Sequence, residues 1–208
     1  MTSPDPDTAD LPPDAVLVRT RAEWRQWLQH HHGRPQGVWL VTFRQGSGQA
    51  APGYDAAVEE ALCYGWVDSR PKKLDERRTM LWFAPRKPGS AWARPNKLRV
   101  QRLIAQGLMV PAGLAKVQAA QADGSWEKLD AVEDGVVPGD LAAALATWPD
   151  ARRHWDAFPR SARRGILEWI VQARTVPTRE RRVQETARLA QDNRRANQWA
   201  PKPGARPP

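Results

Sequence analysis

The chain has 208 residues, 41% hydrophobic and 26% charged, a balance typical of a folded globular protein and not of a disordered one. Its net charge of +9 and its pI near 10.4 favour polyanionic partners such as nucleic acid or an anionic membrane surface. A single cysteine excludes an intramolecular disulfide, and no stretch has the roughly 18 apolar residues that a membrane span needs. Because the start shows no signal-peptide pattern, we expect a cytoplasmic protein.

Both ends of the chain have the composition of disordered segments. Residues 1–14 are acidic and rich in proline, and residues 200–208 form a second proline-rich tail. An extended run at 15–18 opens the predicted α+β domain, residues 15–122. Thr20 is a suitable N-cap for the helix that follows.

The rest of this domain alternates between strand and helix patterns. We predict a strand at 38–43, a helix from Asp55 to Gly65, an extended pair at 66–67, a strand at 80–84, and helices at 91–106 and 112–122. Asp55 is expected to cap its helix, with Glu59 and Glu60 on the outer face. Gly46-Ser47-Gly48, which follows Arg44, is interpreted as a hairpin turn and not as an anion-binding nest.

The second half of the chain reads as helical. Residues 123–139 are acidic and weakly periodic, which predicts a connector, and residues 140–199 form a helical module. We expect its helices at 141–145, 151–155, 161–173 and 178–192. The predicted fold class is α+β, predominantly helical, with a small antiparallel sheet and packed helices followed by this module.

Few residues suggest catalysis or metal binding. Cys63 lies near a predicted helix C-terminus, where the helix dipole opposes thiolate formation, so it is interpreted as a buried structural cysteine. His30, His31 and His32 point about 100° apart on a helix and cannot converge on one ion, so they read as a solvated helix end. We predict no catalytic residue, no metal site and no cofactor, and the sequence leans away from an enzyme.

Basic residues are concentrated in one segment. Arg70 to Arg102 contains eleven basic and two acidic residues, and aromatic residues lie among them. Cations with nearby aromatic rings suit phosphate backbones and base stacking. The predicted nucleic-acid-binding residues are Lys72, Lys73, Arg77, Arg78, Arg86, Lys87, Arg94, Lys97, Arg99 and Arg102. The alternative is an ordinary solvated surface, since no recognised nucleic-acid-binding motif is present.

Several motifs in the same order resemble the YdeI/OmpD-associated, bacteriocin-protection family of bacteria. They lie at 60–68 (EALCYGWVD), 83–92 (FAPRKPGSAW), 99–104, 123–127 (DGSWE), 157–164 and 178–186. The resemblance covers roughly residues 15–199, and the family's defining module corresponds to about Asp140 to Gln191. It implies a role in stress or antimicrobial tolerance, and it implies no reaction and no catalytic residues.

Three functional hypotheses remain open from the sequence. The leading one is a non-enzymatic protein that binds nucleic acid or another polyanion in stress tolerance. The alternative is a small-molecule-binding protein or uncharacterised enzyme with a site between the two modules. Its possible ligand pocket consists of Trp66, Asp68, Trp92, Asn197 and Trp199. A membrane-surface role is disfavoured because no helix combines a cationic face with a wide apolar face. The sequence leaves the oligomeric state open.

Overall fold

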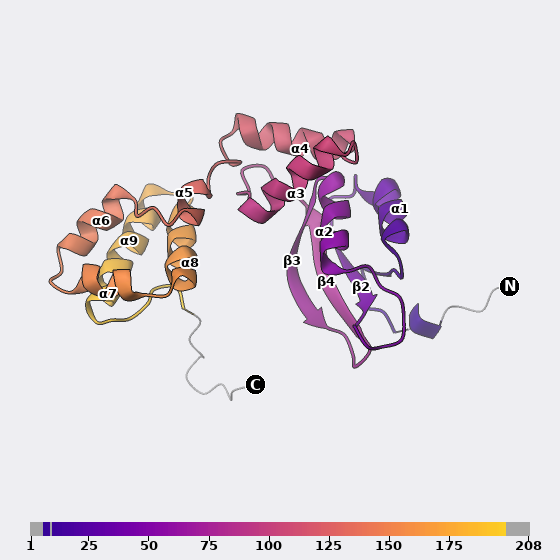
Figure 1. Ribbon diagram of the computed structural model, residues 1–208, viewed down its shortest axis with the longest axis horizontal. Helices are drawn as coiled ribbons and strands as arrows, with labels where there is room; N and C mark the ends of the chain where they lie inside the picture. The colour runs from indigo at the N-terminus through magenta and orange to yellow at the C-terminus, as the bar shows by residue number, and fades with distance from the viewer. Residues whose placement is uncertain (1–5, 9, 199–208) are drawn as a thin grey trace. The chain divides into compact units, whose positions relative to one another are not determined.

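The structure is a computed structural model that describes residues 6–8 and 10–198 (Figure 1). It confirms a helix-rich α+β chain, and it divides into two compact units between Trp126 and Glu127. That division lies inside the segment predicted as a connector, which also contains the short helix α5 (Asp130–Glu133). Of the predicted N-terminal arm, Pro6–Thr8 form a 3-10 turn. The predicted tail, residues 200–208, lies outside the described residues.

The N-terminal unit is built on a sheet in the order β1 (Ala15–Leu17), β2 (Val38–Phe43), β4 (Arg78–Pro85), β3 (Trp66–Lys73). β2, β4 and β3 pair antiparallel, as predicted, but β1 pairs with β2 in parallel. The sheet is therefore mixed. Helix α1 lies between β1 and β2 in sequence and returns the chain, so that both strands run the same way.

Helices α1 (Arg21–His31) and α2 (Tyr54–Cys63) cover one face of this sheet (Figure 1). Thr20 caps α1 as predicted, because its hydroxyl accepts a hydrogen bond from the Glu23 amide at 3.1 Å. The indole of Trp24 donates to the Ala57 carbonyl at 3.0 Å and so fixes α1 against α2. Helix α2 also contacts β3, α3 (Arg94–Ala105) and α4 (Pro111–Ala122).

Two predictions about α2 are wrong. The helix begins at Tyr54 after the extended Gly53, so Asp55 lies in the first turn and does not cap it. Glu60 is only 3% exposed and not on the outer face. It faces α1, where it binds Arg21 and Arg25 at 2.5 and 2.7 Å. Their positive charges make the burial of this carboxylate possible.

The predicted hairpin at 46–48 is also wrong. The neighbouring strands β2 and β4 are joined through α2 and β3, so residues 44–53 form a loop that leads from the sheet to α2. Gly46 and Gly48 have φ angles of +86° and +75°, in the left-handed region that favours glycine. The glycines therefore allow the loop to turn from β2 into α2 without forming a hairpin.

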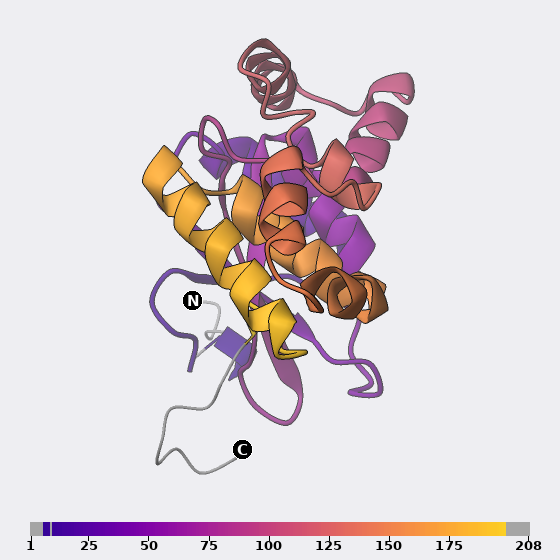
Figure 2. The same cartoon turned by 90° about the vertical axis from the view of Figure 1, so that its left-hand side faces the viewer.

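The C-terminal unit consists of helices in its described part. They are α5, α6 (Gly139–Ala146), α7 (Ala151–Ala157), α8 (Arg160–Val171) and α9 (Val176–Gln191). The yellow α9, prominent in Figure 2, packs against α6, α7 and α8. Its core includes the fully buried Leu145, Trp155 and Ile166. Among the residues that the structure describes, no helix is long and apolar enough to cross a membrane.

Candidate functional site

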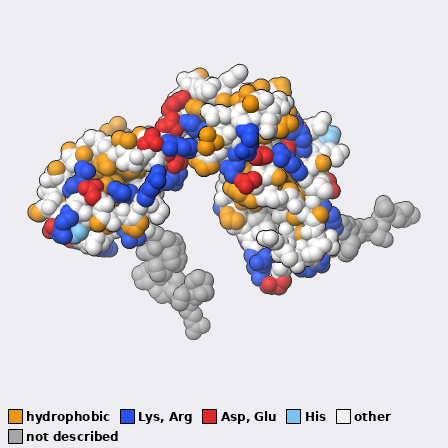
Figure 3. Space-filling model, viewed as in Figure 1, with side chains coloured by type: hydrophobic (Ala, Val, Ile, Leu, Met, Phe, Trp, Pro, Cys, Tyr) orange, Lys and Arg blue, Asp and Glu red, His pale blue; other side chains and the backbone are white. Residues whose placement is uncertain are grey.

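Many of the cations predicted to bind nucleic acid lie in ion pairs within the N-terminal unit. Among the described residues, these pairs include Arg99 with Asp55, Arg102 with Glu59, Arg78 with Asp75, Lys73 with Glu76, and Arg77 with Asp7. Basic and acidic side chains accordingly lie next to one another on the face seen in Figure 3. A cation that already has a carboxylate partner gains less from a phosphate, so the local basicity overstates the free positive charge.

The other predicted cations are in varied surroundings. Lys97 lies over the Trp126 ring, and Arg94 is the first residue of α3. Arg86 is buried, whereas Lys72 and Lys87 are exposed. The structure therefore does not bring the ten residues together as one uniform basic surface.

The predicted pocket residues are also dispersed. Trp66 and Trp92 are each 1% exposed in the core of the N-terminal unit, and the Trp66 indole donates to the His32 carbonyl at 3.0 Å. Asn197 belongs to the C-terminal unit, and Trp199 lies outside the described residues. Asp68 alone lines the large cavity described next.

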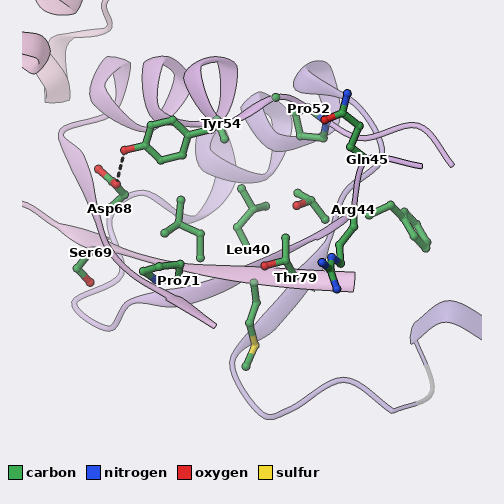
Figure 4. A pocket seen from close by; sticks show the side chains of 15 residues that line it. Leu40, Arg44, Gln45, Pro52, Tyr54, Asp68, Ser69, Pro71 and Thr79 are labelled. Atoms are coloured by element: carbon green, nitrogen blue, oxygen red, sulfur yellow. Dashed lines mark hydrogen bonds between the residues drawn. The ribbon is translucent and has the colours of Figure 1, made fainter. Parts of the chain in front are cut away.

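A cavity of about 550 Å³ lies between the sheet, the loop at 44–53 and the beginning of α2 (Figure 4). Leu40 and Pro71 both pair with Leu81 in the strand register, so all three side chains lie on one face of the sheet. At one end of that face, Val38 and Phe83 are buried in the core cluster with residues of α1 and α2. The other end of that face is left open and forms the apolar floor of the cavity. The volume of the cavity is typical of small-molecule sites.

Polar groups lie at the two ends of this floor. At one end, the Tyr54 hydroxyl donates a hydrogen bond to the Asp68 carboxylate at 2.9 Å (Figure 4). Arg44 and Gln45 lie at the opposite end. Burial and the bond to Asp68 raise the pKa of Tyr54, so its phenol remains a protonated donor at neutral pH.

Positive charge extends beyond the Arg44 end. A neighbouring cavity of about 250 Å³ shares Arg44, Pro71 and Thr79 with the first and adds Lys72 and Lys73. Among the described side chains, no carboxylate lies within ion-pair distance of Arg44 or Lys72. This end of the site can therefore hold an anionic group, whereas the Asp68 end accepts hydrogen bonds.

A bulge in β3 gives the two sheet faces different chemistry. The register with β4 shifts by one residue between Asp68 and Pro71, so that Ser69 and Arg70 together lie opposite Trp82. The Arg70 guanidinium lies 5.9 Å from the ring centroids of both Trp39 and Trp82. These two half-buried rings project from the face opposite Leu40 and Leu81, since side chains alternate along a strand.

Cys63 lies in the core of the N-terminal unit, and the histidine run lies at the C-terminal end of α1. Cys63 is fully buried, and burial, with the charge of Glu60, raises the pKa of its thiol. The Nδ1 atoms of His30 and His31 bond to backbone carbonyls one turn earlier, at 2.8 Å. No group of His, Cys, Asp or Glu side chains in the described part of the chain is arranged to hold a metal.

The sequence alone does not identify Tyr54, and it places Arg44 only next to the glycines that follow it. Nothing local links Tyr54 to Asp68, fourteen residues away. Their proximity depends on how α2 packs over β3. An aromatic residue immediately before a predicted helix was the one available signal.

Two family models match the chain. Residues 16–116 match a domain of unknown function (DUF8412), and residues 134–193 match the family described as bacteriocin-protection, YdeI or OmpD-associated. The second match confirms the resemblance, although it covers the C-terminal unit and not all of residues 15–199. No curated protein and no solved structure matches the chain significantly.

Proposed function

Because the C-terminal unit carries a bacteriocin-protection, YdeI or OmpD-associated domain, we propose that the protein acts in antimicrobial tolerance by binding a small amphipathic molecule. The binding site is the cavity over the sheet of the N-terminal unit. The observation that carries this proposal is the apolar floor with opposite polar ends, the Tyr54–Asp68 pair and Arg44. This places the pocket alternative ahead of the nucleic-acid hypothesis.

The chemistry of the two ends defines the ligand class. The Asp68 carboxylate has lone pairs beyond the one that Tyr54 uses, so it accepts from an amine or hydroxyl of the ligand. Arg44, with Lys72 nearby, binds a carboxylate or another anionic group. Leu40 and Leu81 contact an apolar middle section. The ligand is thus an elongated molecule with a donor at one end and an acid at the other.

The test is a thermal-shift and calorimetric titration of the full chain with ω-amino carboxylic acids of increasing length. Stabilisation is expected to peak at the length that spans Asp68 to Arg44. Replacing the amine by a methyl group is expected to cost affinity in the native chain but not in Asp68→Asn. Replacing the carboxylate by an amide is expected to cost affinity in the native chain but not in Arg44→Gln.

The matched control is Arg174→Gln, which removes an exposed arginine of the C-terminal unit. It is expected to bind as the native chain does. If no member of the series stabilises the chain, or if Arg44→Gln and Arg174→Gln have the same effect, the pocket proposal is wrong.

Single-stranded nucleic acid is a second candidate, and the opposite sheet face favours it. Trp39 and Trp82 meet edge to face with centroids 5.1 Å apart, next to Arg70. Aromatic rings on a sheet with an adjacent arginine provide a stacking surface for bases. Each stacked base contributes about 1–3 kcal/mol.

Labelled single-stranded DNA and RNA, titrated at two salt concentrations, test this second candidate. Arg70→Gln and Lys72→Gln are expected to weaken binding and to flatten its salt dependence. Arg99→Gln is the matched control, because that guanidinium already binds Asp55. Absence of binding at low salt would eliminate nucleic acid as the ligand.

A further inference from the structure

A second, smaller site lies where two distant motifs of the N-terminal unit meet. The segment 83–92 (FAPRKPGSAW) and the segment 123–127 (DGSWE) are joined by a backbone hydrogen bond from the Trp92 amide to the Ser125 carbonyl at 3.3 Å. A cavity of about 50 Å³ lies between them, lined by residues that include Arg86, Trp92 and Ser125. A buried water needs roughly 10–15 Å³, so this space accommodates a small polyatomic group.

Three buried polar atoms of the residues around this cavity have no hydrogen-bond partner. They are Arg86 Nε, Trp92 Nε1 and Ser125 Oγ. The first two can only donate, whereas the serine hydroxyl can both donate and accept. The two N–H groups cannot satisfy each other, and an acceptor placed between the three atoms would pair with all of them. Buried polar groups in native proteins are rarely left without a partner.

Arg86 adds a buried charge, which Asp68 stabilises only from beyond ion-pair distance. Its side chain is 5% exposed, and its guanidinium stacks 3.7 Å above the Trp92 ring. One terminal nitrogen donates to the carbonyls of Ser90 and Ala91 at 3.3 and 3.0 Å. No carboxylate lies within ion-pair distance of it among the described side chains. Burial lowers the pKa of Arg86 to about 10, so it remains charged at neutral pH.

The charges around the cavity favour an anion. Lys87 and Lys116 also line it, and neither has a carboxylate partner among the residues that the structure describes. Among the described residues that line the cavity, the acidic one is Asp123. Its carboxylate accepts from the Gly89 amide at 3.2 Å and from the Ser125 amide at 2.9 Å, so these donors partly neutralise it. The balance of formal charge at the cavity is positive.

We propose that this cavity is an oxyanion-binding site, in which Arg86, the Trp92 indole and the Ser125 hydroxyl hold a phosphate or carboxylate group. The anion supplies a counter-charge in direct contact with buried Arg86 and accepts from all three unpartnered groups. The site is separate from the amphipathic cavity, because the two share no lining residue.

The test measures anion binding by the full chain at constant ionic strength. Equilibrium dialysis with labelled phosphate and thermal shifts with phosphate, acetate and chloride are expected to show a saturable oxyanion site that persists in Arg44→Gln, a variant of the other cavity. Tighter phosphate binding would indicate a phosphate group, and tighter acetate binding a carboxylate group. Absence of saturable binding, or equal binding of chloride, would overturn the proposal.

Variants locate the site. Trp92→Phe keeps an aromatic ring but removes the N–H donor, and Ser125→Ala removes the hydroxyl, so each is expected to weaken binding about tenfold. Trp155→Phe is the matched control, because it also removes a buried, unpartnered indole N–H but in the C-terminal unit. Equal losses in Trp92→Phe and Trp155→Phe would overturn the assignment. Arg86→Met is expected to abolish anion binding. If this variant does not fold, Trp92→Phe and Ser125→Ala still test the proposal.

Discussion

At the scale of single residues, Glu60 shows how a buried carboxylate is stabilised by neighbouring positive charges. It is 3% exposed on α2 and binds Arg21 and Arg25 of α1. We expect Glu60→Gln to lower the free energy of unfolding by about 2 kcal/mol, because two partly buried guanidinium groups lose their shared carboxylate. Chemical denaturation monitored by circular dichroism measures this change.

The control for Glu60 is Glu76→Gln. Glu76 is 86% exposed and pairs with Lys73 on the surface, where ion pairs contribute little. It is expected to leave the free energy of unfolding unchanged within the error of the measurement. Equal effects of the two substitutions would mean that the α1–α2 ion pairs do not stabilise the fold.

Cys63 gives a second prediction at this scale. Its thiol is fully buried, and burial raises its pKa, so little thiolate forms and reagents have no access. We expect the native chain to resist alkylation at pH 8 and to react with one equivalent of reagent after denaturation. Mass spectrometry of labelled samples measures this, and rapid labelling of the native chain would contradict it.

At the scale of elements, two helical glycines distinguish the effect of close packing on stability from the effect of helix propensity. A β-carbon at Gly113 in α4 would lie 2.2 Å from the Cys63 carbonyl oxygen, whereas one at Gly165 in α8 would meet nothing within 4 Å. Gly113→Ala is therefore expected to destabilise the protein by roughly 2 kcal/mol. Gly165→Ala is expected to stabilise it by about 1 kcal/mol. Thermal unfolding of both variants distinguishes these signs, and matching signs would refute the packing argument.

The ion pair between α6 and α9 makes the free energy of unfolding depend on pH. Arg179 holds Asp140 with bonds of 2.7 and 3.1 Å, and these bonds keep the pKa of Asp140 below its usual range. Because the unfolded carboxyl binds protons more tightly, this contribution is present above pH 3.8 and is lost as the pH falls through the lower folded pKa.

We expect Asp140→Asn to destabilise the C-terminal unit by about 0.5–1 kcal/mol at neutral pH, since the pair is partly exposed. The difference from the native chain is expected to shrink toward pH 2. Denaturation at several pH values measures it. A constant difference across that range would show that the ion pair is not responsible.

At the scale of the whole molecule, each unit buries its own core. The N-terminal core joins the sheet to α1, α2 and α3, and the C-terminal core is formed between α6, α7, α8 and α9. We therefore expect fragments 1–126 and 127–208 to unfold cooperatively on their own, and fragment 1–126 to retain both proposed binding sites. Calorimetry of the fragments measures this, and an unfolded fragment would contradict it.

The sequence determined most elements, because hydrophobic periodicity and capping residues act locally. Thr20, the run at 38–43 and the C-terminal helices show this clearly. The same local patterns indicated a basic surface at 70–102 and a structural role for Cys63. They also supported the resemblance to the YdeI/OmpD-associated proteins, which the family match at 134–193 confirms for that part of the chain.

Tertiary structure alone decided which side chains meet. The parallel pairing of β1, the buried Glu60, the Tyr54–Asp68 bond and the approach of Ser125 to Trp92 all join residues distant in sequence. It also showed that Arg99 and Arg102 have carboxylate partners. The number of basic residues in the segment therefore overstates the positive charge available to a polyanion. Periodicity reports only which face of an element is apolar, whereas pairing and proximity depend on packing between elements.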